Sequence, residues 1–156
     1  GHRFLAPGPV EIADAASYVA ALERAKVIVE PTARRTRVQN EIARIEREHN
    51  VKVRSDEALL DEVQHLAEWP VGLLGEFAAS YLDVPQEIIV TAMRTHQRYF
   101  AVENALGGLA NKFVTMMGTE VTDPTVVQRG NERVLAARLA DAAFFFGEDS
   151  SVLARV

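Results

Sequence analysis

Apolar and polar residues follow two different periods along this chain. In five segments the apolar residues recur every three or four positions, which predicts amphipathic helices. These predicted helices span residues 14–25, 32–49, 55–66, 85–96 and 124–146. Short runs rich in β-branched or aromatic residues predict strands at 26–30, 51–53, 68–75, 98–103 and 112–117. We therefore expect an α+β fold of irregularly interleaved helices and short strands with a mixed or antiparallel sheet.

Capping and turn residues support several of these boundaries. Ser55 is a suitable N-cap for the third helix, and Pro85 suits the first turn of the fourth. Asp123 is expected to cap the long C-terminal helix. The glycines of the strand 68–75 indicate a bulge or a close backbone approach. The pair Gly107–Gly108 supplies the turn of a hairpin between the last two strands.

The length of 156 residues suits one domain or two small ones, with a possible sub-boundary near residue 54. Residues 4–12 are apolar but interrupted by two prolines and a glycine, which suits a short edge strand or an extended arm. The chain has no initiator methionine and ends within a stretch compatible with a helix. We expect a single fragment of a larger protein.

Composition limits the possible functions. The absence of cysteine excludes a disulfide scaffold, a thiolate metal site and a cysteine nucleophile, and it is compatible with the cytoplasm, which we expect to be the location. The net charge of −5 disfavours a domain that coats nucleic acid. No apolar run approaches the length of a membrane span, so no membrane contact is expected.

No stand-alone active site emerges from the residues. The four histidines lack metal-ligand spacing, so we expect no metal and no catalytic residue. His96 lies at the end of a predicted helix. There it either interacts favourably with the helix dipole or contacts a ligand or a neighbouring domain. The carboxylates of Asp56, Glu57, Asp61 and Glu62 are interpreted as a solvated helix face.

Arginines give the stronger functional indication. Arg34, Arg35 and Arg37 fall in the first turns of a helix, where the helix dipole disfavours cations by about 0.3–1 kcal/mol each. Such a cluster needs acidic neighbours or an anionic partner. One interpretation is pairing with Glu30 and Glu41, and the alternative is contact with RNA phosphates.

The last helix carries a second set of arginines. Arg129, Arg133 and Arg138 are expected roughly along one side, with Asn131 beside them. Arg138 and Asp141 are spaced for a simple ion pair. Because polar groups lie close to the apolar stripe of this helix, we expect it to dock against another surface.

Several longer stretches are specific enough to indicate a family. They are residues 95–102, 107–109 and 130–146, with residues 1–7, 68–71 and 84–87 in support. In residue identity, order and spacing they resemble the β subunit of bacterial heterotetrameric glycyl-tRNA synthetase. This resemblance places the chain in the N-terminal half of that subunit.

The resemblance implies an enzyme of two α and two β subunits that ligates glycine to tRNA(Gly) with ATP and magnesium, both bound by the α subunit. It implies that this fragment needs no cofactor of its own and is non-catalytic, supporting tRNA binding or domain organisation. Its expected partners are the α subunit, tRNA(Gly) and the remaining β-subunit domains. The alternative is a vestigial editing-type, aminoacyl-tRNA hydrolase-like domain. The candidate contact residues are Arg34, Arg35, Arg37, His96, Arg98, Arg129, Asn131, Arg133 and Arg138.

Overall fold

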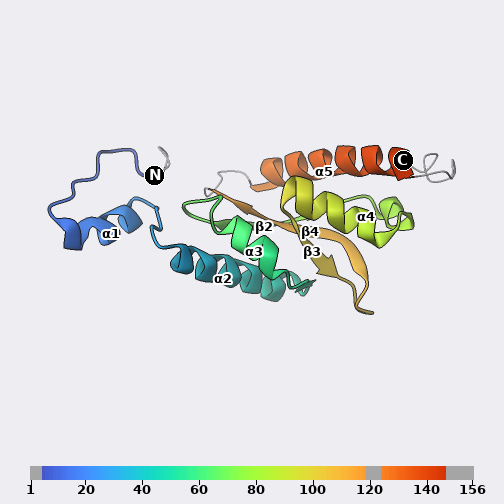
Figure 1. Ribbon diagram of the computed structural model, residues 1–156, viewed down its shortest axis with the longest axis horizontal. Helices are drawn as coiled ribbons and strands as arrows, with labels where there is room; N and C mark the ends of the chain where they lie inside the picture. The colour runs from blue at the N-terminus through green and yellow to red at the C-terminus, as the bar shows by residue number, and fades with distance from the viewer. Residues whose placement is uncertain (1–4, 119–123, 147–156) are drawn as a thin grey trace.

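The computed structural model describes residues 5–118 and 124–146. The strands of these residues form one four-stranded antiparallel sheet with the order β1-β3-β4-β2 (Figure 1). The strands are β1 (Lys52–Val53), β2 (Val71–Glu76), β3 (Phe100–Glu103) and β4 (Leu109–Met117). The sheet is the middle layer of the fold.

Helices cover both faces of the sheet. The helical elements are α1 (Ala15–Arg24), α2 (Pro31–His49), α3 (Glu57–Val63), the 3₁₀ helix η1 (Ala79–Asp83), α4 (Gln86–Thr91), the π-helix η2 (Ala92–Gln97) and α5 (Pro124–Phe146). Helices α2 and α3 lie on one face, and α4, η2 and α5 lie on the other (Figure 1). The expected α+β class is confirmed, in the form of an antiparallel sheet between two helical layers.

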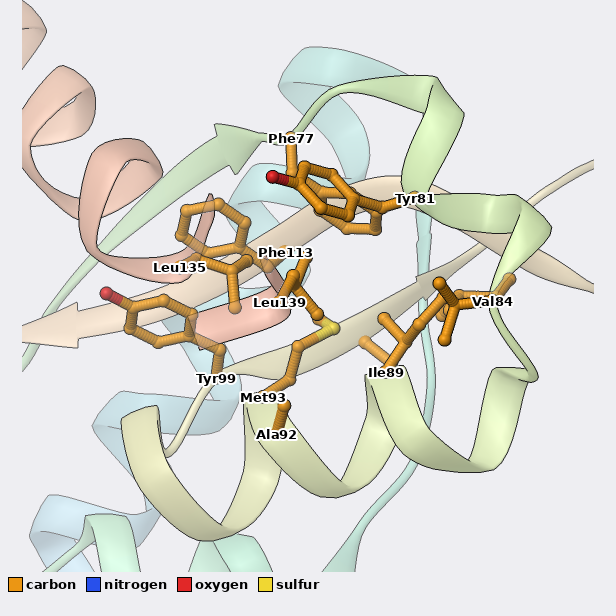
Figure 2. Packing of buried hydrophobic residues seen from close by; sticks show 12 residues of the cluster. Phe77, Tyr81, Val84, Ile89, Ala92, Met93, Tyr99, Phe113, Leu135 and Leu139 are labelled. Carbon is orange, nitrogen blue, oxygen red and sulfur yellow. The ribbon is translucent and has the colours of Figure 1, made fainter. Parts of the chain in front are cut away.

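Two hydrophobic cores follow from the alternation of side chains along β4. Successive strand residues point to opposite faces of a sheet. Val114 therefore packs under α2 and α3 together with Val38 and Ile45. Phe113 points to the other face and lies among the side chains of η2 and α5, including Leu135 (Figure 2). All five of these side chains are at most 1% exposed.

Local sequence signals placed most helices correctly but one strand wrongly. Residues 26–30 form no strand. Although this run is β-branched, no strand lies beside it: the amide of Val27 donates to α1, and the amide of Ile28 donates to the carbonyl of Glu68. The N-cap of α3 is Asp56 and not Ser55, because the Asp56 carboxylate accepts from the amide of Leu59 at 2.9 Å.

The glycines of β2 serve close packing and not a bulge. The register between β2 and β4 is regular over all six residues of β2. A Cβ at Gly72 would lie 2.8 Å from Cδ1 of Ile45, and a methyl group at Gly75 would overlap the ring of Phe113. The irregular pairing lies instead between Ala101 and Glu103 of β3.

The predicted helix 85–96 is divided into two kinds of helix. Its first turns are α4, and the chain then widens into the π-helix η2. Arg98, at φ 56°, adopts the left-handed conformation that ends it. The predicted cap at Asp123 lies outside the described residues, and the arm at residues 5–13 contains no strand.

Strand β1 is joined to β3 by an ion pair at their shared end. Lys52 donates to the Glu103 carboxylate at 2.9 Å, and Arg54 Nε lies 3.6 Å from it. The hydrogen bond from Lys52, helped by the charges of Lys52 and Arg54, holds the pKa of Glu103 below its ordinary value of 4.5. The ionised carboxylate therefore favours the folded chain.

We expect Lys52→Met to raise the pKa of Glu103, and Lys52→Arg to leave it low because the charge is kept. A depressed pKa contributes stability above the unfolded-state pKa, and this contribution is lost as the pH falls through the folded-state pKa. A pH titration of the side-chain carboxyl by NMR measures the shift. An unchanged pKa in Lys52→Met would contradict this account.

Candidate functional site

The arginine cluster of α2 is engaged within the fold. Arg35 donates through one guanidinium nitrogen to Asp61 and through the other to Glu57. Both acids belong to α3, so this pair of contacts clips α2 to α3. The expected partners, Glu30 and Glu41, were wrong, because the acids that Arg35 reaches lie 22 and 26 residues away in sequence.

The other acids of the α3 segment pair with arginines from η2 and its end. Arg94 Nε lies 2.8 Å from Asp56, and Arg98 Nε lies 3.3 Å from Glu62. The side chains of Glu57, Asp61 and Glu62 are 72%, 66% and 56% exposed, so the interpretation as a solvated face is confirmed for these three, although arginines from two sides pair with them. Asp56, at 26% exposed, is the exception. Arg98, a candidate contact residue, has an acidic partner within the chain.

Arg37 and Lys26 lie beside Trp69. The Arg37 guanidinium lies 3.9 Å from the centre of the Trp69 ring, and its Nε donates to the carbonyl of Pro70 at 2.7 Å. Lys26 also lies over this ring, with Nζ 4.7 Å from the centre. Arg34 is half-buried, and its Nε has no hydrogen-bond partner among the described residues. These cations therefore pack against the protein and do not form an open basic patch.

The arginines of α5 are placed differently. Arg129, Arg133 and Arg138 are all exposed, and within the described residues none of them makes an ion pair, Arg138 with Asp141 included. At 3.6 residues per turn, Arg129 and Arg133 lie on one side, whereas Arg138 lies two and a half turns beyond Arg129. The expectation of a single line was wrong. Val134 lies between Arg133 and Arg138 around the helix and is 49% exposed.

Other polar groups of α5 face the sheet. The Glu132 carboxylate accepts from the amide of Glu76 at 3.0 Å, at the outer edge of β2. Asn131 Nδ2 donates to Sδ of Met117 at 3.9 Å. Asn131 therefore contacts β4 and is not part of the exposed arginine face. These contacts orient α5 so that Arg129 and Arg133 point outward.

His96 lies exposed in the last turn of η2, where the helix dipole favours a positive charge. Among the described residues, no group of three His, Cys, Asp or Glu side chains is arranged to hold a metal ion. None of the described helices offers an apolar stretch of the length that crossing a bilayer requires.

The sequence analysis did not identify Arg44, whose side chain forms a hydrogen bond with the edge strand β2. Arg44 pairs with Glu41 and Glu48 at 2.7 Å each and donates to the carbonyl of Gly72 at 3.0 Å. Burial acts to lower the pKa of Arg44, but the hydrogen bonds and charges of the two glutamates outweigh it and raise the pKa. The spacings of three and four residues within α2 were a visible signal for the ion pairs, whereas the contact with β2 was not.

Sequence comparison identifies the family. The model for the glycyl-tRNA synthetase beta subunit matches residues 1–154. The chain belongs to this family. The resemblance noted from the sequence motifs is thereby confirmed.

Relatives from several bacteria share close to half of their residues with this chain. It is 48% identical over 150 residues to the glycine–tRNA ligase beta subunit of Anaeromyxobacter sp. (strain K), covering 96% of the chain and 21% of the relative. It is 46% identical over 149 residues to that of Moorella thermoacetica, covering 96% and 22%. It is 45% identical over 152 residues to that of Syntrophotalea carbinolica, covering 97% and 22%. The chain thus spans about a fifth of the length of these relatives.

Proposed function

We propose that this chain is a non-catalytic part of a cytoplasmic glycine–tRNA ligase that joins glycine to tRNA(Gly) with ATP. The observation that carries the proposal is the family match over residues 1–154. ATP and Mg²⁺ are then bound by the α subunit, and the partners of this chain are that subunit, tRNA(Gly) and the rest of the β polypeptide. Its own contribution is a surface that holds tRNA.

The exposed arginines of α5 are the best candidates for that surface. Arg129 and Arg133 stand one helical turn apart, and neither has an acidic partner among the described residues. The nearby Glu132 is turned toward β2, where its carboxylate accepts from a backbone amide. Two neighbouring guanidinium groups of this kind can each neutralise a phosphate. The α2 arginines support the proposal less, because Arg35 and Arg37 have partners within the fold.

The proposal predicts weaker, less salt-sensitive binding of tRNA(Gly) by the complete β subunit when Arg129 and Arg133 are both replaced by alanine. Each lost phosphate contact makes the slope of log affinity against log salt shallower by about 0.9, so the double variant should lose about 1.8. Filter binding or fluorescence anisotropy across a salt series measures this slope.

Arg47→Ala is the matched control, because Arg47 is also exposed but lies on α2, on the other side of the sheet. Its slope should equal that of the wild type. Equal slopes for the double variant and the wild type would remove α5 from the tRNA surface. In that case a lower melting temperature of complete β with Arg133→Ala would indicate that α5 docks on another domain instead.

The editing-type alternative gains no support from the described residues. It stays a prediction, and release of an amino acid from mischarged tRNA by the β subunit is the measurement that bears on it.

A further inference from the structure

Helix α1 and the segment before it extend away from the three layers of the fold (Figure 1). In α1 only Ala21 is buried. Four large apolar side chains are 39–45% exposed here, namely Val10, Ile12, Tyr18 and Val19. Isolated apolar side chains are normal on a protein surface, but a group of them on one projecting element indicates a contact surface.

A helix of this length is not stable without packing. Helices shorter than about 12–15 residues are marginal in water, and α1 has ten residues. The capping box between Asp14 and Ser17 contributes on the order of 1 kcal/mol, which does not replace tertiary contacts. At 3.6 residues per turn, Ala20 lies about 160° around the helix from Tyr18, on the face opposite to it.

The base of α1 is nevertheless fixed to the body of the fold. Lys26, just after the helix, lies over the Trp69 ring, and the amide of Ile28 donates to the carbonyl of Glu68 at 2.9 Å. The amide of Val27 donates back to the last turn of α1. The helix is therefore held in a defined direction, in which Val19 lines a hollow together with Val27 and Ala33. Tyr18, on another side of the helix, is 43% exposed.

Charge selects the kind of partner. Residues 10–19 carry Glu11 and Asp14 and no lysine or arginine, whereas Arg24 and Lys26 lie at the other end of α1 beside Glu23. An acidic apolar surface repels nucleic acid and anionic lipid and attracts a basic rim. A second copy of this chain has a net charge of −5 and is disfavoured for the same reason.

We infer that the apolar surface of residues 10–19 is covered by a protein surface with an apolar centre and a basic rim, supplied by the part of the β polypeptide beyond these 156 residues. The chain spans only 21% of a relative such as that of Anaeromyxobacter sp. (strain K), so most of the surface available for this contact belongs to the same polypeptide. A surface on the same polypeptide acts at an effective concentration that reaches about millimolar for a short linker, which favours it over a dilute free partner. The inference rests on family membership and does not depend on contact with tRNA.

Hydrogen exchange on the complete β subunit, without the α subunit or tRNA, tests this inference. The amides of α1 should be protected, and Tyr18→Glu should reduce their protection at least about tenfold. Ala20→Glu adds the same charge on the opposite face of α1 and should leave the protection unchanged. The amides of α2 serve as an internal reference for correct folding, so a general loss of structure is recognised.

Three results would overturn the inference. The first is fast exchange of α1 in the wild-type β subunit that slows only when the α subunit is added. The second is protection that depends on protein concentration, which would indicate a second copy. The third is equal protection in the Tyr18→Glu and Ala20→Glu variants. None of these readouts involves tRNA affinity, so this test and the arginine test fail independently.

Discussion

Replacing Phe113 by alanine is expected to lower the free energy of unfolding of this chain by about 3–5 kcal/mol. The Phe113 side chain is fully buried at the centre of the core on the α5 side of the sheet (Figure 2). Its ring stacks on Tyr99 with a distance of 4.4 Å between the ring centres and 10° between the planes. Neighbours such as Leu135 come from separate elements and cannot collapse together into the space that the ring leaves.

Urea unfolding followed by circular dichroism measures this change. Leu106→Ala is the matched control, because Leu106 lies on the β3–β4 turn and is 96% exposed. The control should change the free energy of unfolding by at most about 0.5 kcal/mol. A loss below about 1 kcal/mol for Phe113→Ala would show that the core on this face is not packed as described.

The contact between Phe113 and Gly75 allows a second test of how this core is packed. These residues are directly opposite each other on β4 and β2, and the ring occupies the space that a side chain at Gly75 would need. We expect Gly75→Ala to cost about 1–3 kcal/mol through overpacking. Combining it with Phe113→Leu should cost less than the sum of the two single changes, because leucine removes the atoms that clash.

Elements whose local pattern agrees with their tertiary surroundings could be predicted from the sequence. The apolar spacing of α2 predicts its buried face, and Val38 and Ile45 are indeed buried. Residues 26–30 show the opposite case, since their β-branched side chains favour a strand but the fold places no strand beside them. Strand preference is realised only when a partner strand is available.

For the candidate site, the sequence predicted the types of residue involved but not their partners. Of the three clustered α2 arginines, Arg35 binds acids, as the helix dipole suggested, but those acids come from α3; Arg37 instead packs on Trp69. Ion pairs between residues more than 20 positions apart depend on the packing of two helices, which no local pattern specifies. Helical spacing alone, by contrast, separates Arg138 from Arg129 and Arg133, so this part of the error was avoidable.

The outer edge of β2 is completed by side chains of α2 in place of another strand. One carboxylate oxygen of Glu41 accepts from the amide of Gly72 at 3.1 Å and from Arg44. Arg44 in turn donates to the carbonyl of the same glycine. The Glu41 side chain is only 15% exposed, so water does not readily replace it. An unpaired strand edge is otherwise open to association with other chains.

We therefore expect Glu41→Ala to lower the free energy of unfolding by about 2–3 kcal/mol, because it leaves a partly buried amide and a guanidinium group without their acceptor. Glu41→Gln keeps an oxygen acceptor for the amide of Gly72 and should cost less. Glu48→Ala is the matched control, since Glu48 pairs with Arg44 at 2.7 Å but is 52% exposed, and surface ion pairs contribute at most about 1 kcal/mol. Urea unfolding of the three variants measures the order of these losses. Equal losses for Glu41→Ala and Glu48→Ala would mean that Glu41 acts only as a partner of Arg44, and that the edge of β2 is stabilised without it.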